Sequence, residues 1–200
     1  TMLEWYRSYV GLEAIQQELE ELIQFLSGSP IPFRKATVAD LFLQFTSYQL
    51  TPDTSREELS IWARELGLDQ HPSDDWNDLF FRIFMEKVEA QIGSEPLFVY
   101  DFPSQQASLS KVVEGWSQRF ELYWGGMELA NAYLEVNDPQ QNQDRFEKEA
   151  NNRRASGKEI SPFDEEYFRL LNQGMPPASG IAVGLDRLWA VLNSKNQIRW

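Results

Sequence analysis

Residues 120–135 read FELYWGGMELANAYLE, and this stretch decides the fold because it combines a turn signal with a cluster of carboxylates. Gly125 and Gly126 separate two largely apolar runs and predict a two-residue β-hairpin turn, since the tight primed turns need positive φ at both central positions. Residues that flank such a turn pair with each other, and alternate positions of a strand share one face of the sheet. Three side chains are therefore expected on one face: Glu121, Tyr123 and Glu128.

The segment that follows the hairpin extends this polar cluster. Beyond Leu129 the spacing of apolar residues predicts a helix, which would place Asn131 and Glu135, four residues apart, on one helix face. Carboxylate and amide oxygens are the groups that bind hard cations. The sequence therefore predicts one pocket, lined by three acids and an amide: Glu121, Glu128, Glu135 and Asn131.

The chain before this stretch begins with a strand and a helix. Residues 2–6 alternate apolar and polar side chains, as a half-buried strand does. Residues 12–26 place apolar side chains at helical spacing, and Gly28 with Pro30 ends that helix.

Residues 27–95 are expected to form a mostly helical insertion with a strand near Phe33. Its aromatic side chains lie at helical spacing, which is typical of core packing, so no catalytic cluster is expected in it. Its three helices are expected to begin at Thr37, at Ser55 and after Ser73, the last running to Gly93.

The remaining elements predict an α+β fold. Strands are separated by helical pieces of unequal length without a regular βαβ alternation, which indicates a mainly antiparallel sheet within one domain, residues 1–200. The expected elements are a strand at 97–100, helices at 111–117, from Asp138-Pro139 and at 162–174, a glycine-rich strand at 180–184 and a helix from Asp186.

Composition bounds the class of protein. With 200 residues, 42% of them hydrophobic, the chain can bury the core of one globular domain. Cysteine is absent, which excludes disulfides and thiol nucleophiles, and the single histidine, His71, precedes Pro72 in a polar stretch typical of a loop. No apolar run approaches the roughly 20 residues of a membrane span, and no basic-then-apolar leader is present, so we expect a soluble, cytoplasmic protein.

Charge argues against a nucleic-acid partner. The chain carries 31 acidic and 18 basic residues, a net charge of −13, which repels phosphate backbones unless basic side chains gather on one face. The one basic cluster, residues 148–158, is interleaved with glutamates and is typical of a solvated helix face. We therefore expect no nucleic acid, tRNA included, to bind at the predicted pocket.

Three further segments, together with the hairpin, carry a resemblance to a known family. Residues 1–7 read TMLEWYR, residues 98–109 read FVYDFPSQQASL, and residues 174–188 read GMPPASGIAVGLDRL. In their order and spacing they resemble class II aminoacyl-tRNA synthetases of the lysine type. Aspartyl-type enzymes have a similar third segment, but the first segment and the hairpin favour the lysine type. The resemblance is strongest to the lysyl-tRNA-synthetase-related GenX/PoxA group, the ligases that attach β-lysine to elongation factor P.

The resemblance implies a class II synthetase-like catalytic domain, with an ATP-dependent activity. A lysyl- or β-lysyl-adenylate would form and pass its acyl group to a lysine of elongation factor P. Thr1 would fall within the family's motif 2, so we expect the chain to lack the N-terminal part of the domain, including motif 1 and the motif 2 arginine. Because motif 1 forms the family's dimer, the complete protein is expected to be a homodimer.

The resemblance also implies residue roles at the nucleotide end of the pocket. Glu121 and Glu128 would be catalytic, holding Mg²⁺ and the phosphates of ATP. Arg187 would be the motif 3 arginine that contacts ATP, next to Gly184, where a missing side chain lets a flat ligand approach the backbone.

At the amino-acid end, Glu4, Tyr6 and Glu135 would recognise the side-chain ammonium of the substrate, and Asn131 would hold its main-chain end. Ala182 stands where lysyl-tRNA synthetases carry glycine, so it is expected to influence substrate choice. Ala132 also replaces a common glycine and is expected to tighten the pocket.

Two alternatives stay open. The chain would also suit the catalytic core of a lysyl-tRNA synthetase, or a non-catalytic synthetase paralogue that acts as a binding module. The choice between α-lysine and β-lysine is open as well.

Overall fold

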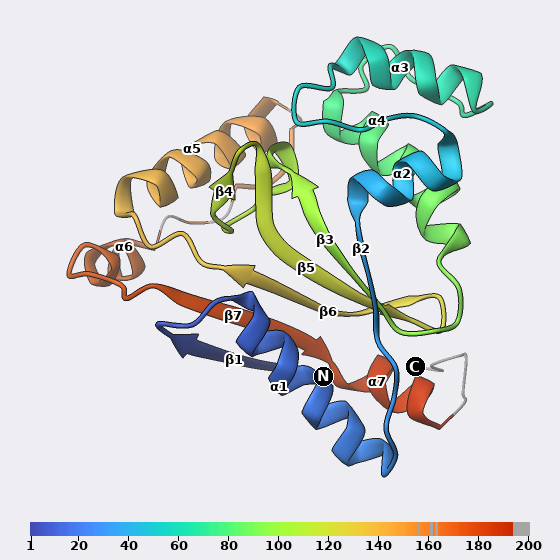
Figure 1. The fold of residues 1–200 in the computed structure, drawn as a ribbon. Helices are drawn as coiled ribbons and strands as arrows, with labels where there is room; N and C mark the ends of the chain where they lie inside the picture. The colour runs from blue at the N-terminus through green and yellow to red at the C-terminus, as the bar shows by residue number, and fades with distance from the viewer. Residues whose placement is uncertain (156, 161, 163, 194–200) are drawn as a thin grey trace.

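The structure is a computed structural model that describes residues 1–155, 157–160, 162 and 164–193. In this part of the chain the strands form one sheet in the order β1-β7-β6-β5-β3-β2, with β4 paired to β5 (Figure 1). All neighbours are antiparallel except β2 and β3, so the predicted α+β fold with a mainly antiparallel sheet is confirmed. The strands are β1 (Met2–Ser8), β2 (Arg34–Thr37), β3 (Leu97–Pro103), β4 (Val112–Val113), β5 (Trp116–Trp124), β6 (Met127–Leu134) and β7 (Ala178–Gly184).

Helices lie on both sides of this sheet and at its ends (Figure 1). The α-helices are α1 (Leu12–Ser27), α2 (Val38–Thr46), α3 (Arg56–Glu65), α4 (Trp76–Ile83), α5 (Pro139–Ala155), α6 (Glu165–Leu171) and α7 (Leu185–Leu192). Helix α4 continues into a π-helical turn η1 (Phe84–Val88) and a 3₁₀ turn η2 (Glu89–Gln91), and a second 3₁₀ turn, η3 (Ser104–Gln106), follows β3.

One face of the sheet is covered by α1 and α7. Ile15, Leu19 and Ile23 of α1 are fully buried against it, as its spacing of apolar residues predicts. Neighbouring positions of a strand point to opposite faces, so Arg119, Glu121 and Asn131, which lie next to strand residues of this core cluster, project to the opposite face. Those strand residues are Phe98, Phe120, Leu122, Leu129, Ala130, Ala132, Ile181 and Val183.

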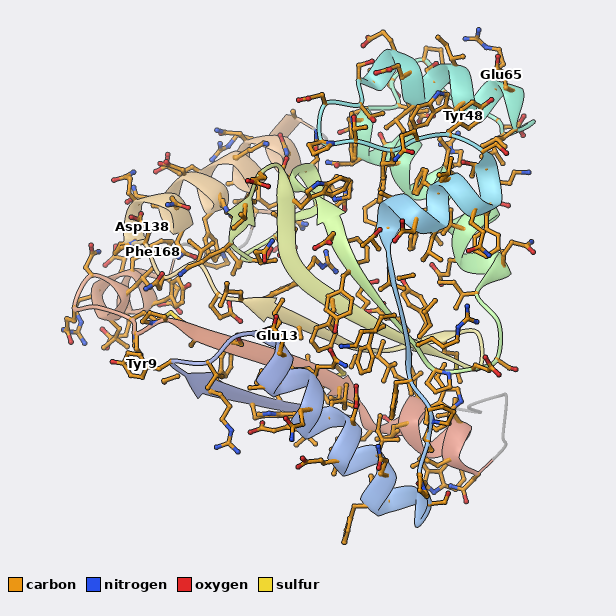
Figure 2. All side chains as sticks on the ribbon, viewed as in Figure 1. Tyr9, Glu13, Tyr48, Glu65, Asp138 and Phe168 are labelled. Atoms are coloured by element: carbon orange, nitrogen blue, oxygen red, sulfur yellow. The ribbon has the colours of Figure 1, made fainter. Side chains whose placement is uncertain are left out.

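The opposite face is covered only in part. A second core cluster joins α2, α3, α4 and η1 to Leu97, Val99 and Phe102 of β3 and to Tyr123 of β5. Glu65, the last residue of α3, accepts a hydrogen bond from the hydroxyl of Tyr48, in the loop after α2 (Figure 2). The helices therefore leave the β6, β7 and β1 part of this face open for a site.

The predicted helix starts of the 27–95 segment are confirmed at Thr37 and Ser55, where each side chain forms a reciprocal capping box with the third helical residue. The third helix begins at Trp76 with Asp75 as its cap and runs through η2 to Gln91, close to the predicted end. The predicted strand near Phe33 is β2, which begins one residue later and pairs in parallel with β3.

Two predicted helices are wrong. Residues 111–117 form β4 and a hairpin turn, because Glu114 and Gly115 both adopt positive φ (50° and 83°), which a helix excludes. The segment after Leu129 continues as strand β6, because β5 and β7 pair with it on both edges and outweigh the helix propensity of its alanines.

The helix predicted at 162–174 is shorter than expected. Helix α6 begins after Asp164, whose side chain accepts a hydrogen bond from the Tyr167 amide at 2.9 Å, and it ends at Leu171. Among the described helices, none combines the length and the apolar character that crossing a bilayer requires.

Candidate active site

Five of the predicted site residues lie on the open face of the sheet, in two neighbouring cross-strand rows. Each row crosses β1, β7, β6 and β5, so it spans three strand spacings, about 14 Å. The first row is Glu4, Ala182, Asn131 and Glu121. The second is Tyr6, Gly180, Tyr133 and Arg119.

A β-bulge brings Glu128 to the same face. Leu122 pairs with Ala130, but Tyr123 pairs with Glu128, so Leu129 is an extra residue in β6. In an unbroken strand Glu128 and Asn131, three residues apart, would point to opposite faces. The bulge places both on the open face, and it confirms the predicted pairing of Tyr123 with Glu128 around the Gly125-Gly126 turn.

The Glu121 carboxylate is buried and forms side-chain hydrogen bonds and an ion pair with three neighbouring residues. Its side chain is buried, with 7% of the residue's surface exposed. One carboxylate oxygen is paired with the Arg119 guanidinium and accepts a hydrogen bond from the Asn131 amide at 3.3 Å. The other accepts a hydrogen bond from the Tyr123 hydroxyl at 2.7 Å. These contacts fix the orientation of the carboxylate.

Arg119 is a site residue that the sequence reasoning missed. Its guanidinium lies 4.4 Å from the centroid of the Phe102 ring and 5.1 Å from that of Tyr133, and it donates to the Gln106 carbonyl at 2.8 Å. A lone arginine two positions before Glu121 in a buried strand was the signal that could have revealed it, since such a charge must be paired. Its Nε is buried and has no partner among the described residues, and the same holds for Oδ1 of Asn131.

Two further charged residues surround Glu128. Arg187, in the first turn of α7, donates to the Glu128 carbonyl at 2.6 Å, and a Cβ at Gly184 would lie 3.5 Å from its Cδ. Burial and then the Glu121 carboxylate raise the pKa of Glu128 to about 7, against the opposing effect of Arg187. Glu89 of η2 lies near these residues: burial and then the Glu121 carboxylate raise its pKa, and Arg187 opposes that shift. The sequence had not indicated this residue.

At the other end of the rows the side chains of Tyr6 and Glu135 both lie over the backbone of Gly180. A Cβ at Gly180 would lie 2.4 Å from the Tyr6 ring and 2.6 Å from a Glu135 carboxylate oxygen, so only glycine permits this approach. Partial burial, Glu135, Glu4 and then Tyr167 raise the pKa of Tyr6. Burial raises the pKa of Glu135 to about 7, and no described side chain pairs with its carboxylate.

The structure places the predicted acids and amide on one face of the sheet, although one reason given for this was wrong. Asn131 and Glu135 share a face because positions two and four apart in an extended strand point to the same side, and not because of helical spacing. Tyr167 of α6 also lies near this end, because Glu135 helps to raise its pKa; the sequence had not indicated it. Figure 2 shows Asp138 and Phe168 at the α5 and α6 end of the molecule.

Ala182 and Ala132 have different surroundings. Ala182 pairs with Glu4 on one side and Asn131 on the other, in the first cross-strand row. Ala132 is fully buried in the apolar core on the opposite face, so the expectation that it tightens the pocket was wrong.

The raised pKa values predict that two site glutamates lower the stability of the fold. Glu128 and Glu135 have an ordinary pKa of 4.5 when unfolded and about 7 when folded, so the folded state binds more protons between these values. Stability should therefore fall as pH rises from about 4.5 to 7. Because both side chains are partly exposed, we expect Glu128→Gln or Glu135→Gln to stabilise the protein at pH 8 by only about 1 kcal/mol.

Urea unfolding at pH 5 and pH 8 measures this effect. At pH 5 each variant should match the wild type, whose carboxyl groups are then largely protonated. A variant less stable than the wild type at pH 8 would contradict the raised pKa values.

The described residues include no group of three or more histidine, cysteine, aspartate or glutamate side chains arranged to hold a metal ion. Glu121 and Glu128 nevertheless lie on the same face of the hairpin, and after burial the Glu121 carboxylate is the next cause that raises the pKa of Glu128. Mg²⁺ takes one or two protein carboxylates and completes its shell with water and phosphate oxygens, so this pair fits a metal that arrives with a nucleotide.

Comparisons with known proteins show what the chain is similar to in sequence. A sequence profile for tRNA synthetases of class II (D, K and N) matches residues 1–200. The chain is similar to three proteins named elongation factor P–(R)-β-lysine ligase. The one from Haemophilus influenzae (strain PittGG) is 36% identical over 96% of this chain and 60% of its own length. Those from Buchnera aphidicola subsp. Acyrthosiphon pisum and Photorhabdus laumondii are each 34% identical, over 99% and 94% of this chain and 62% and 59% of their own lengths. The chain therefore spans about 60% of the length of these relatives.

Proposed function

The chain belongs to the class II tRNA synthetases of the D, K and N group, and from that premise we propose that it carries the adenylate-forming site of a ligase that joins β-lysine to a lysine of elongation factor P. The names of its curated relatives support this choice of substrate and acceptor. The proposal rests on one observation: the charged residues of the open sheet face lie in two groups, at opposite ends of the cross-strand rows. Glu135 and Glu4, with no cation paired to them among the described residues, lie at one end, and the Glu121 and Glu128 carboxylates with Arg187 lie at the other.

The acidic pocket suits the ammonium group of a lysine side chain. Glu135 is partly buried and unpaired among the residues that the structure describes, and Tyr6 and Glu4 lie beside it. A buried carboxylate without a partner is costly, and a bound ammonium removes that cost. Asn131, in the middle of the first row, would hold the main-chain end of the amino acid through its unpartnered Oδ1.

The other end suits ATP. Glu121 and Glu128 would hold Mg²⁺, which would neutralise phosphate charge when bound. Arg187 would contact the nucleotide beside Gly184, because its planar guanidinium can both stack on a base and bind oxyanions. Arg119 forms an ion pair with the Glu121 carboxylate and holds it in one orientation.

The reaction would proceed in two balanced steps. The carboxylate of the amino acid attacks the α-phosphorus of ATP, and pyrophosphate leaves. The neutral amine of the acceptor lysine then attacks the carbonyl of the adenylate, so that an amide bond forms, AMP leaves and the amine releases a proton. Before the first step the open face would hold the amino acid and ATP along the same rows, which favours reaction through proximity. We also propose that the protein works in the cytoplasm, where elongation factors act.

A lysyl-tRNA synthetase core is the second candidate, because the family includes lysine-specific synthetases. The net charge of −13 argues against it, since binding to tRNA depends on neutralising phosphates. A non-catalytic paralogue is less well supported still, because it would not need to keep both carboxylates and Arg187.

ATP–pyrophosphate exchange with β-lysine or α-lysine tests the amino-acid part of this proposal in the protein at its natural full length. Ala182→Gly is expected to lower the preference for β-lysine over α-lysine about tenfold, because removing one methyl group from the wall of the pocket weakens shape discrimination by roughly 1 to 3 kcal/mol. The ratio of the two kcat/KM values is the measurement. An unchanged ratio would exclude Ala182 as a selectivity residue, and the absence of exchange with either amino acid would contradict adenylate formation.

A further inference from the structure

A polar cleft lies beside the candidate active site and is not explained by adenylate formation. Its volume is about 530 Å³, and it lies between α5 and the segment from η3 to Leu109, with part of β5 as its floor. Figure 1 shows α5 next to β4 and this end of β5. Its lining includes three cations, Arg119, Arg145 and Lys148.

The cleft and the candidate active site share a wall. The Arg119 guanidinium pairs with Glu121 on one side, and its Nη1 donates to the Gln106 carbonyl at 2.8 Å. Both Gln106 and Arg119 line the cleft. One side chain therefore separates the cleft from a carboxylate of the adenylate site.

The charge of the cleft is opposite to that of the protein. Three bases and one acid, Glu149, line it, whereas the chain as a whole has a net charge of −13. Arg145 is held in place because its Nη1 donates to the carbonyls of Ser108 and Ser110, both at 2.6 Å. Burial lowers its pKa, and no carboxylate in the described part of the chain pairs with it. A partly buried guanidinium without a counter-ion favours the binding of an anion.

The rest of the lining favours a polypeptide over a nucleic acid. The side chains of Gln105 and Asn152 supply amide donors and acceptors, the groups that bond to a peptide backbone. Three cations, one of them already paired with Glu121, could neutralise only a few phosphates. They suit one or two carboxylates of a folded partner.

We propose that this cleft docks an acidic segment of the acceptor protein and thereby brings the acceptor lysine to the neighbouring adenylate. The inference rests on the proposed function and deepens it, because it assigns a surface to the recognition of the second substrate. Electrostatic complementarity of this kind orients the partner and raises the association rate.

Lys148→Glu tests the proposal, because Lys148 is exposed and its side chain forms no hydrogen bond or ion pair with the described residues. Lys158→Glu is the matched control: it makes the same charge change ten residues away, outside the cleft. We expect Lys148→Glu to raise the KM for elongation factor P about tenfold with little change in kcat, and Lys158→Glu to change it by less than about twofold. ATP–pyrophosphate exchange, which involves no acceptor, should be equal in both variants. Equal KM values for both variants would overturn the cleft as a docking site.

A binding measurement separates this proposal from the proposed function. If the wild type forms the adenylate but transfers nothing to elongation factor P, the choice of acceptor fails, and the cleft can still be tested by fluorescence anisotropy.

The probe is a fluorescein-labelled peptide of consecutive glutamates, with a glutamine peptide as its uncharged control. The glutamate peptide should bind the wild type and the Lys158→Glu variant more tightly than the Lys148→Glu variant. Equal binding to all three proteins, or displacement of the peptide by an RNA oligonucleotide at a lower concentration than by unlabelled peptide, would overturn an acidic polypeptide as the occupant.

Discussion

Replacing Glu121 or Glu128 by glutamine is expected to lower ATP–pyrophosphate exchange about a thousandfold while the fold is kept. The isosteric amide removes a negative charge from the carboxylate pair without changing its volume, and the loss of a metal ligand costs on the order of 4 kcal/mol in the transition state. The Glu128 variant is the cleaner of the two, because Glu128 makes no side-chain ion pair in the described structure, whereas Glu121 neutralises Arg119.

The exchange rate at saturating ATP, with a titration of Mg²⁺, is the measurement. Glu86→Gln, at an exposed position of η1, is the matched control and should exchange at the wild-type rate. Near-normal exchange in both site variants would remove the metal-binding role proposed for this pair.

Replacing Arg119 by methionine is expected to destabilise the protein by about 3 to 5 kcal/mol, because it leaves the buried Glu121 carboxylate without its partner. The double variant Arg119→Met with Glu121→Gln should recover much of this loss, since no uncompensated charge is then buried. Arg119→Lys keeps the charge but loses the flat contacts with Phe102 and Tyr133, so an intermediate loss is expected.

Urea unfolding of the wild type, the single variants Arg119→Met and Glu121→Gln, and the double variant gives the coupling free energy between Arg119 and Glu121. If Arg119→Met lowers the free energy of unfolding by less than about 1 kcal/mol, the pair does not stabilise the fold as proposed. If the loss in the double variant equals the sum of the two single losses, Arg119 and Glu121 are not coupled.

Local chemistry in the sequence was enough to predict the hairpin and several helix starts. Gly125 and Gly126 determine their turn through positive φ, and Thr37 and Ser55 determine helix starts through their capping boxes. These features depend on residues within a few positions of one another, so no tertiary contact was needed to predict them.

The predictions that failed concern elements whose structure depends on residues distant in the sequence. Strand β6 was taken for a helix because its pairing with β5 and β7 is not visible in its own residues. The bulge at Leu129 and the contacts of Arg119 with Gln106 and Phe102 arise only when separate segments meet. Glu89 lies in η2, at the end of a helix whose apolar spacing is typical of core packing, so the sequence did not indicate that it lies near Glu121 and Arg187.

The central claim, that this chain belongs to a ligase with a protein acceptor, is tested most directly by a competition between acceptors. The protein at its natural full length is incubated with ATP, Mg²⁺ and labelled β-lysine, together with equal amounts of elongation factor P and lysine tRNA. The account predicts that the label is found on a lysine of elongation factor P and that the tRNA stays uncharged. Efficient charging of the tRNA, with no label on the protein, would contradict it in favour of a lysyl-tRNA synthetase.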